Sequence, residues 1–595
     1  MRVLVRTFLS AAFAALAAAW APASEIAWQD WSDAPFARAK AEKRLVLLDL
    51  GAVWCHWCHV MEETTYKDPK VVNLISEHFV AVRVDQDSRP DLSNRYEDYG
   101  WPATILFDAS GRELAKLAGY IPPPRMASLL EAFVADPTPG PSARPDEARR
   151  PAAGAALSPA LRQELTEILS ARYDGERGGW GFAKKYLDWE SVEWCLSRAR
   201  GGDPDGLRMA RETLERSRKL IDPVWGGLYQ YSDSGDWDHP HFEKLMQFQA
   251  EGMRIYAQAY ALWKDPADLE AARAIHRYVR AFLTSPEGAF FVSQDADLVA
   301  GEHGGEYYAL PDVERRGRGV PRVDTHLYAR ETAWGALALV SLHGATGEEP
   351  LLDEALKAAR WIVEHRALPG GGFRHDAHDA AGPYLGDTVA AGRLFLALYA
   401  STGDREWLAR AAAAAEFIGK RFVASRAPGF VSAASGTRFA PARPQRDENV
   451  AVVRFANLLF RYTARRRHRD LARRAMTLLA VPDVAKRFST ASILLVDAEL
   501  SSEPEHVTVV GRRADPRTRS LLAAALSDPS GYKRIEVWDP AEGPLPNADV
   551  VFPELDRPAA FVCAHGRCSQ PVFEPGLVRD RVERLRAASA KTPSG

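Results

Sequence analysis

The feature that most constrains this chain is a short apolar run that ends in two closely spaced cysteines. Residues 45–50, "LVLLDL", have the composition of a buried strand. After them comes Cys55-His56-Trp57-Cys58-His59, and a helical pattern begins at Val60. Cys-x-x-Cys ahead of a helix is typical of a thiol–disulfide active site. Cys-x-x-Cys-His also attaches c-type haem, and two cysteines beside two histidines can hold zinc.

The segments after this motif continue as an α/β unit. We expect two further strands, a turn and a closing helix near residues 80–84, 103–107, 108–111 and 126–133. Asp49 stands six residues before Cys55, and Pro102 directly precedes the third strand. This order and these residues resemble thioredoxin over roughly residues 27–135. The resemblance implies a thioredoxin-like domain at 24–135 with a cis Trp101–Pro102 bond.

Thiol–disulfide chemistry gives a role to each residue around the motif. The thiolate is the nucleophile, and the N–H groups and dipole of a helix N-terminus stabilise it at Cys55. An imidazolium at His56 or His59 would add to that effect. We therefore expect Cys55 to attack, Cys58 to resolve, and a buried Asp49 to accept the proton of Cys58. A cis bond before Pro102 would present backbone to an extended substrate strand. This chemistry needs no metal and no cofactor, and we expect neither.

Three other uses of the motif stay open. Haem would consume Cys55 and Cys58 as thioethers and use His59 as an axial ligand, where the fold needs a strand-to-helix corner. Zinc would take the same cysteines and histidines. A purely structural disulfide is the third alternative.

The N-terminus has the pattern of a signal peptide. Arg2 and Arg6 precede an uncharged stretch, residues 7–20, and Ala21-Pro22-Ala23 forms an A-x-A-like cleavage site. We expect cleavage after Ala23 and export, to the periplasm, with an uncleaved anchor as the alternative. Oxidising conditions there favour disulfide chemistry.

The composition restricts the possible partners. In 595 residues the formal net charge is −3, which gives no reason to expect nucleic acid or an anionic membrane surface. The length predicts two to four domains. No later stretch is apolar enough to span a bilayer, so we expect no stable membrane insertion after signal cleavage. Among the five cysteines, Cys195 lies in a helical pattern, and we expect it to be a buried apolar group.

A linker rich in proline, alanine and charge, residues 136–156, leads into a long helical region, 157–491. About twelve segments there have the three–four spacing of buried helix faces. Between them recur glycine turns followed by aromatic and polar residues, such as "GGWGF", "WGGLYQYSD" and "GGGFRHDA". Twelve helices with such loops on one rim resemble the all-α (α/α)6 toroid of six-hairpin glycosidases and N-acylglucosamine epimerases.

Nearly all of the mature chain resembles a known family. "WCHWCHVMEETTYKDPKVVNLISEHF", "GGLYQYSDSGDWDHPHFEKL" and "SPEGAFFVSQDAD" are similar to the thioredoxin-domain proteins that include spermatogenesis-associated protein 20 and bacterial relatives. The resemblance implies a thioredoxin-like domain, a six-hairpin glycosidase-like domain and a small C-terminal segment. The chain departs from the family at Gln247-Phe248-Gln249, where Tyr-Asp-Asn is usual.

Acidic, basic and aromatic residues of the toroid loops are candidates for a ligand site. Glycoside hydrolysis needs two carboxylates, one protonated and one ionised. Glu243 with Asp295 or Asp297 could supply them, and His241 could serve an epimerase-like proton transfer. The alternative is that such residues cap helices or bind water. The candidates are His241, Glu243, Lys244, Asp295, Asp297, Tyr229, Asp387 and Lys184.

The C-terminal segment, residues 492–595, changes pattern to a small α/β unit. Cys563 and Cys568 flank a turn-like "AHGR", and we expect a local disulfide between them. A sharper hypothesis is that this second pair exchanges with Cys55–Cys58 as an internal relay.

Three function classes follow. The first is an exported thiol–disulfide oxidoreductase whose toroid recognises a protein thiol or disulfide partner. The second is a carbohydrate-active enzyme, a glycosidase or epimerase, with an ancillary thioredoxin domain and a carbohydrate ligand. The third is a non-catalytic binding protein. The sequence leaves the direction of redox flow open.

Overall fold

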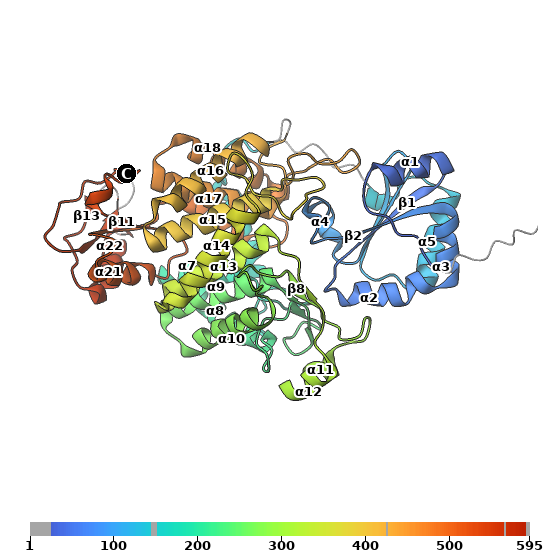
Figure 1. Cartoon of the computed structure of the whole chain (residues 1–595), viewed down its shortest axis with the longest axis horizontal. Coiled ribbons are helices and arrows are strands. Elements are labelled where there is room, and N and C mark those ends of the chain that lie inside the picture. Colours follow the sequence, from blue (N-terminus) through green and yellow to red (C-terminus); the bar gives the residue numbers. More distant parts are fainter. Residues whose placement is uncertain (1–24, 144–150, 424–426, 565–566, 591–595) are drawn as a thin grey trace, which may run out of the picture.

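The computed structural model describes residues 25–143, 151–423, 427–564 and 567–590. In this part of the chain an N-terminal α/β domain, a central ring of helices and a C-terminal α/β domain follow one another along the long axis (Figure 1). The predicted fold class is confirmed. The predicted signal peptide, 1–23, and residues 144–150 of the predicted linker lie outside the described residues. None of the described helices combines the length and apolarity needed to cross a bilayer.

A four-stranded sheet in the order β2-β1-β3-β4 forms the centre of the N-terminal domain. β1 runs parallel to β2 and antiparallel to β3, and β4 is antiparallel to β3. Helices cover both faces, which is why β1 to β3 are almost continuously apolar. The elements are α1 (Asp33–Glu42), β1 (Leu45–Gly51), α2 (His56–Glu63), α3 (Pro69–His78), β2 (Phe79–Asp85), α4 (Pro90–Tyr96), β3 (Ala103–Phe107), β4 (Glu113–Ala118) and α5 (Pro123–Ala135).

Twelve helices among the described residues form six packed pairs in a closed ring. Each inner helix packs on the next, and α20 closes the ring against α7. The inner helices are α7 (Trp189–Arg200), α9 (Met246–Trp263), α13 (Ala329–Thr346), α15 (Leu385–Thr402), α17 (Arg446–Thr463) and α20 (Ala491–Ser501). Their outer partners are, in the same order, α8 (Pro204–Ser217), α10 (Pro266–Phe282), α14 (Glu349–His365), α16 (Arg405–Arg421), α18 (Arg466–Leu479) and α6 (Pro159–Ala171).

Tight turns join the inner helices to their outer partners. Lys264, Gly347, Gly403 and Ala464 end inner helices in the left-handed conformation, and the next residue already caps the outer helix. Gly403 lies against the C-terminal domain. The longer glycine–aromatic loops therefore gather at the opposite rim, where they meet the N-terminal domain.

These rim loops contain short elements of their own. They form a two-stranded sheet, β5-β6, and a three-stranded sheet, β7-β8-β9. The elements are β5 (Tyr231–Ser232), β6 (Pro240–His241), β7 (Lys244–Leu245), β8 (Ser293–Gln294), β9 (Val323–Asp324), α11 (Gly305–Tyr308) and α12 (Asp312–Arg318); α19 (Pro482–Ala485) precedes α20.

The C-terminal domain repeats the sheet topology of the N-terminal domain. Its strand order is β11-β10-β12-β13, with β10 parallel to β11, antiparallel to β12, and β12 antiparallel to β13. A helix again joins the parallel pair and another follows the last strand, but no cysteine stands between β10 and α21. The elements are β10 (Glu505–Val510), α21 (Pro516–Leu526), β11 (Lys533–Trp538), β12 (Ala559–Ala564), β13 (Arg567–Cys568) and α22 (Val578–Ala590).

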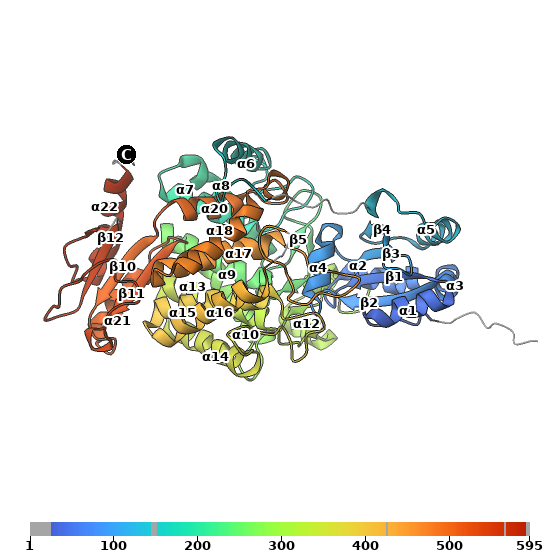
Figure 2. The same ribbon diagram turned by 90° about the horizontal axis from the view of Figure 1, so that it is seen from above.

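The two α/β domains cover opposite ends of the ring, as both ribbon views show (Figures 1 and 2). The expected boundary at residue 491 falls on the first residue of α20, so the ring extends to Ser501. The reason is that α20 supplies the inner helix of the sixth pair, whose outer helix, α6, opens the ring.

Candidate functional site

The cysteine pair stands at the corner between β1 and α2. Cys55 is the N-cap of α2, and its Sγ accepts a hydrogen bond from the backbone N–H of Cys58 at 3.1 Å. The two cysteines form a disulfide, and the Trp101–Pro102 bond is cis, as the sequence predicts. The free N–H groups of a helix N-terminus favour an anion at this position.

The toroid rim covers this corner. Cys55 is only 3% exposed, and it packs with Trp54, Trp101 and Leu245 in one small apolar cluster. Leu245 belongs to β7 of the rim, and the N–H of Ala296 donates to the carbonyl of Trp54 at 3.4 Å across the domain boundary. The sulfur expected to attack a partner thus lies within an interface between two domains.

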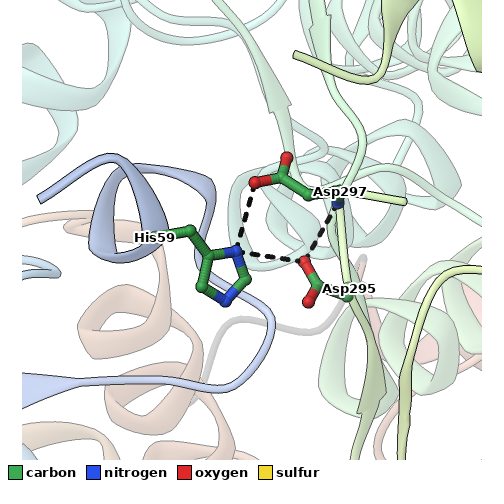
Figure 3. Close-up of side chains that lie close together, drawn as sticks. All are labelled: His59, Asp295 and Asp297. Atoms are coloured by element: carbon green, nitrogen blue, oxygen red, sulfur yellow. Dashed lines mark hydrogen bonds and ion pairs between the residues drawn. The ribbon is translucent and has the colours of Figure 1, made fainter. Parts of the chain in front are cut away.

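Two histidines of α2 bind aspartates of the toroid, and Figure 3 shows the contacts of His59 with Asp295 and Asp297. Nδ1 of His56 lies 2.8 Å from Oδ1 of Asp297. Nδ1 of His59 lies 3.1 Å from Oδ2 of Asp297 and 3.6 Å from Oδ1 of Asp295. Burial opposes protonation of His59, but the hydrogen bond to Asp297 and the charge of Asp295 outweigh it and raise its pKa. The α2 histidines and these aspartates form an ionic latch between the domains.

Glu243 lies beside the same helix end. It is 3% exposed, and its Oε2 has no hydrogen-bond partner among the described residues. Burial raises its pKa to about 7, although the charge and backbone amide of His56 favour the ionised form. His241 lies 4.0 Å from it through Nδ1 and binds Asp233 through Nε2 at 2.6 Å. Glu243 is therefore a carboxyl group that can gain or lose a proton near neutral pH.

Asp49 lies on β1 below the cysteines and is buried. Its carboxylate accepts from Nε of Arg83 at 2.9 Å and from the hydroxyl of Tyr66 at 3.1 Å. Burial raises its pKa, and the charge of Arg83 acts against that rise. No direct bond joins Asp49 to Cys58 in the described structure, so its role as proton acceptor stays a prediction.

The structure divides the predicted toroid residues into separate groups. His241, Glu243, Asp295 and Asp297 come together, but around the redox helix α2 rather than in the ring interior. Lys244 is fully buried and binds Asp222 at 2.8 Å, with the ring of Tyr229 5.1 Å from its Nζ.

Of two further candidates, Asp387 lies apart from both groups, whereas Lys184 adjoins the first group through Asp233, the partner of His241. Asp387 binds His375 at 2.9 Å inside the rim, and the exposed Lys184 lies 3.9 Å from Asp233.

A cavity of about 430 Å³ lies in the ring interior beneath the N-terminal domain. Trp54 and Trp101 line it from that domain, and Trp189, Phe248 and Trp334 line it from inner helices. The two tryptophans next to the disulfide thus also form the cover of the ring.

Carboxyl groups that the sequence analysis missed face this cavity. Burial raises the pKa of Glu190 to about 8, that of Glu448 to about 8 and that of Glu97 to about 7. The guanidinium of Arg393 also lines the cavity, and burial together with the charge of Arg454 lowers its pKa to about 10. The sequence contained one indication of these carboxyl groups. In "WESVEW", Glu190 and Glu193 are three residues apart and therefore lie on the same side of a helix, a side that is otherwise apolar.

A layer of charges separates this cavity from a second one of about 220 Å³ beneath the C-terminal domain. Glu193 accepts from Arg454 at 2.6 Å and pairs with Arg254 at 3.0 Å, and all three residues line both cavities. The interior of the ring is therefore divided rather than open from end to end.

The second cysteine pair is a disulfide across β12 and β13. It belongs to the C-terminal domain, at the end of the ring opposite α2 (Figure 1). Direct exchange with Cys55–Cys58 within one chain is incompatible with this arrangement, so the relay hypothesis is wrong for this conformation. Cys195 is free and buried, as predicted.

The comparisons with known proteins agree with this division of the chain. Residues 18–133 match the family model Thioredox_DsbH, described as a protein of unknown function, DUF255. The chain is similar to spermatogenesis-associated protein 20 of Rattus norvegicus and of Homo sapiens, 28% identical over 312 residues in each, or 45% of this chain. It spans about two fifths of the length of these relatives, 38% and 39%.

Two further similarities concern single parts of the chain. The disulfide bond reductase DsbH of Chlamydia pneumoniae is 23% identical over 111 residues, 17% of this chain and 66% of that protein. A solved D-mannose isomerase covers 58% of this chain and 97% of its own, at 13% identity and a TM-score of 0.44. The family match at the N-terminus and the closed ring of six helix pairs show a thioredoxin-like domain joined to an (α/α)6 toroid.

Proposed function

We propose that this chain is an exported thiol–disulfide oxidoreductase whose redox site is built jointly by the thioredoxin-like domain and the toroid. One observation carries the proposal: toroid residues surround the cysteine pair. Leu245 packs against the small apolar cluster that contains Cys55, Asp297 binds the histidine next to that cysteine, and Glu243 lies at the same helix end.

The chemistry follows from the two sulfurs. In the reducing direction the Cys55 thiolate attacks a partner disulfide, which forms a mixed disulfide and releases one partner thiolate. Cys58 then attacks the sulfur of Cys55, releases the second partner thiolate and re-forms the Cys55–Cys58 disulfide. The partner gains two electrons, and the reverse sequence oxidises a partner dithiol.

In this proposal the toroid exchanges protons with the redox site and restricts the access of partners to Cys55. Glu243, with a pKa of about 7, can exchange a proton during the release of a thiolate. Leu245 and the latch keep Cys55 covered, so a partner has to displace or enter this interface before attack. This arrangement favours recognition of a partner by the rim loops over unselective reaction with thiols in solution.

The test is a pair of redox assays with the full chain. Wild type should reduce insulin disulfides with dithiothreitol as electron source, or oxidise a reduced, scrambled protein. Cys55→Ser should do neither. The matched control is the double variant Cys563→Ser/Cys568→Ser, which removes the other disulfide and should keep the activity. A wild type that is inactive in both directions would contradict the proposal.

Export is tested separately. In fractionated cells, mass spectrometry of the mature chain should find Ser24 at the N-terminus, in the periplasmic fraction. An intact Met1 in the cytosolic fraction would refute this part and leave the redox assays untouched.

The cavity supports a second candidate, a carbohydrate-active enzyme. Trp189 and Trp334 offer faces on which sugar rings can stack, and Glu190 and Glu448 are carboxyl groups that stay protonated at neutral pH. A glycan screen of wild type against Glu448→Gln tests it. Glu243→Gln serves as the control, because Glu243 lies at the redox helix instead of in the cavity.

A further inference from the structure

Three aspartates from two domains converge at the interface, apart from the cysteines. Asp85 is the last residue of β2 in the thioredoxin-like domain and Asp87 follows two residues later, while Asp324 ends β9 in the toroid. One carboxylate oxygen from each lies within 4.8 Å of the other two. Asp87 and Asp324 are 5% and 3% exposed.

Oxygens in this cluster are buried without a hydrogen-bond partner. Oδ1 of Asp85 and Oδ2 of Asp324 have none among the described residues, although the burial of a polar atom normally requires one. The hydroxyl of Tyr328, a residue with no exposed surface, is also unpartnered and interacts electrostatically first with Asp85 and then with Asp324. Two carboxylate oxygens and one hydroxyl group are thus buried near one another without a hydrogen bond among the described residues.

The two nearby positive groups each have one partner already. Nδ1 of His326 binds Oδ1 of Asp324 at 2.5 Å, which leaves the second oxygen of that carboxylate free. Arg330 pairs with Glu331 at 2.6 Å. The cluster of aspartates therefore keeps an excess of negative charge, which a bound cation would neutralise.

We propose that Asp85, Asp87 and Asp324 bind a divalent cation of the calcium type and so join the thioredoxin-like domain to the toroid. Carboxylate and hydroxyl oxygens are the ligands that such hard cations prefer. Calcium–oxygen distances of about 2.3–2.6 Å put opposite ligands roughly 4.6–5.2 Å apart, so the three oxygens fit around one ion. The Tyr328 hydroxyl is the fourth donor from the chain.

The site is linked to the redox corner through Asp87. Its Oδ2 also accepts from Nε1 of Trp54 at 2.7 Å, and Trp54 precedes Cys55. The indole is thus close enough to sensitise the luminescence of a terbium ion bound in place of calcium.

The experiment uses the full chain with terbium alone and then with calcium in competition. Excitation of tryptophan should give terbium emission that calcium abolishes, and calcium should raise the Tm by several degrees. In Asp324→Asn both responses should be lost. The control is Asp98→Asn, an aspartate that pairs with Arg487 across the same interface, which should keep both.

Asp324→Asn should also be more stable than wild type without calcium, because one uncompensated charge is gone. If that variant fails to fold, Asp85→Asn replaces it. The proposal is overturned if wild type shows neither response, or if Asp324→Asn responds as wild type does. The proposal is also overturned if Asp324→Asn is more stable than wild type while wild type does not respond to cations. The three carboxylates would then be held together by shared protons instead of by a cation.

Discussion

The imidazole of His56, next to the cysteine that begins the active-site helix, lies 2.8 Å from the carboxylate of Asp297 in the toroid. The two residues are 241 positions apart in the sequence. Asp297 binds His59 as well, so one toroid carboxylate holds both histidines of the redox helix. Burial opposes ionisation of Asp297, but these two hydrogen bonds outweigh it and lower its pKa.

Replacing this carboxylate should change the titration of His59. In Asp297→Asn the pKa of His59 should fall, because burial then acts against protonation with only the charges of Asp295 and Glu62 opposing it. Histidine-selective NMR measures the value, and His59→Gln identifies the resonance. An unchanged pKa would show that the latch does not form in solution.

Glu243 should make stability depend on pH. A carboxyl group whose pKa is raised on folding stabilises the fold below its unfolded value of 4.5, and this contribution is lost as the pH rises through about 7. The loss is on the order of 3 kcal/mol. Glu243→Gln should therefore gain stability over wild type at pH 8 and little at pH 4.5. Denaturant titrations at both pH values measure the difference, and an equal effect at each would contradict it.

Leu245 should control access to Cys55. Truncation in Leu245→Ala exposes the sulfur, so dithiothreitol should reduce the disulfide several-fold faster than in wild type. The control is Leu207→Ala, a partly exposed leucine on α8. If the rates of wild type and Leu245→Ala are equal, the rim does not cover the disulfide in solution.

The buried group around Lys244 should matter for folding and not for redox chemistry. Asp222 binds both Lys244 and Arg315, and all three side chains are fully buried. Asp222→Asn leaves two buried cations uncompensated and should cost about 3–5 kcal/mol. Lys244→Met keeps the Asp222–Arg315 pair and should cost less than half of that. Urea denaturation separates the two variants, and equal losses would argue against the network.

Much of the fold could be predicted from local sequence patterns. The apolar strand before Cys55 and the proline before β3 identify the thioredoxin-like unit, and the three–four spacing with glycine turns identifies the helix pairs. The repeated topology of the C-terminal domain was not foreseen, since short strands carry a weak local signal and their order depends on pairing between distant segments.

Which residues make up the site depends on contacts between segments that are far apart in the sequence. Glu243 and Lys244 are neighbours in the sequence, and yet one faces the redox helix and the other a buried ion pair. In an extended segment consecutive side chains point to opposite sides, whereas Asp295 and Asp297, two residues apart, reach the same histidine. Their residue types alone made all four candidates for a sugar site. In the structure, the packing of the domains places Glu243, Asp295 and Asp297 at helix α2 and Lys244 in a buried ion pair.

The reduction potential of the Cys55–Cys58 pair tests the central claim most directly. Equilibration with glutathione and dithiothreitol buffers, followed by thiol trapping and mass spectrometry, gives the value for each disulfide of the same chain. A redox-active pair should lie between about −120 and −270 mV, with the position in this range showing whether the protein oxidises or reduces its partner. A value below about −300 mV, typical of structural disulfides, would contradict the proposed function.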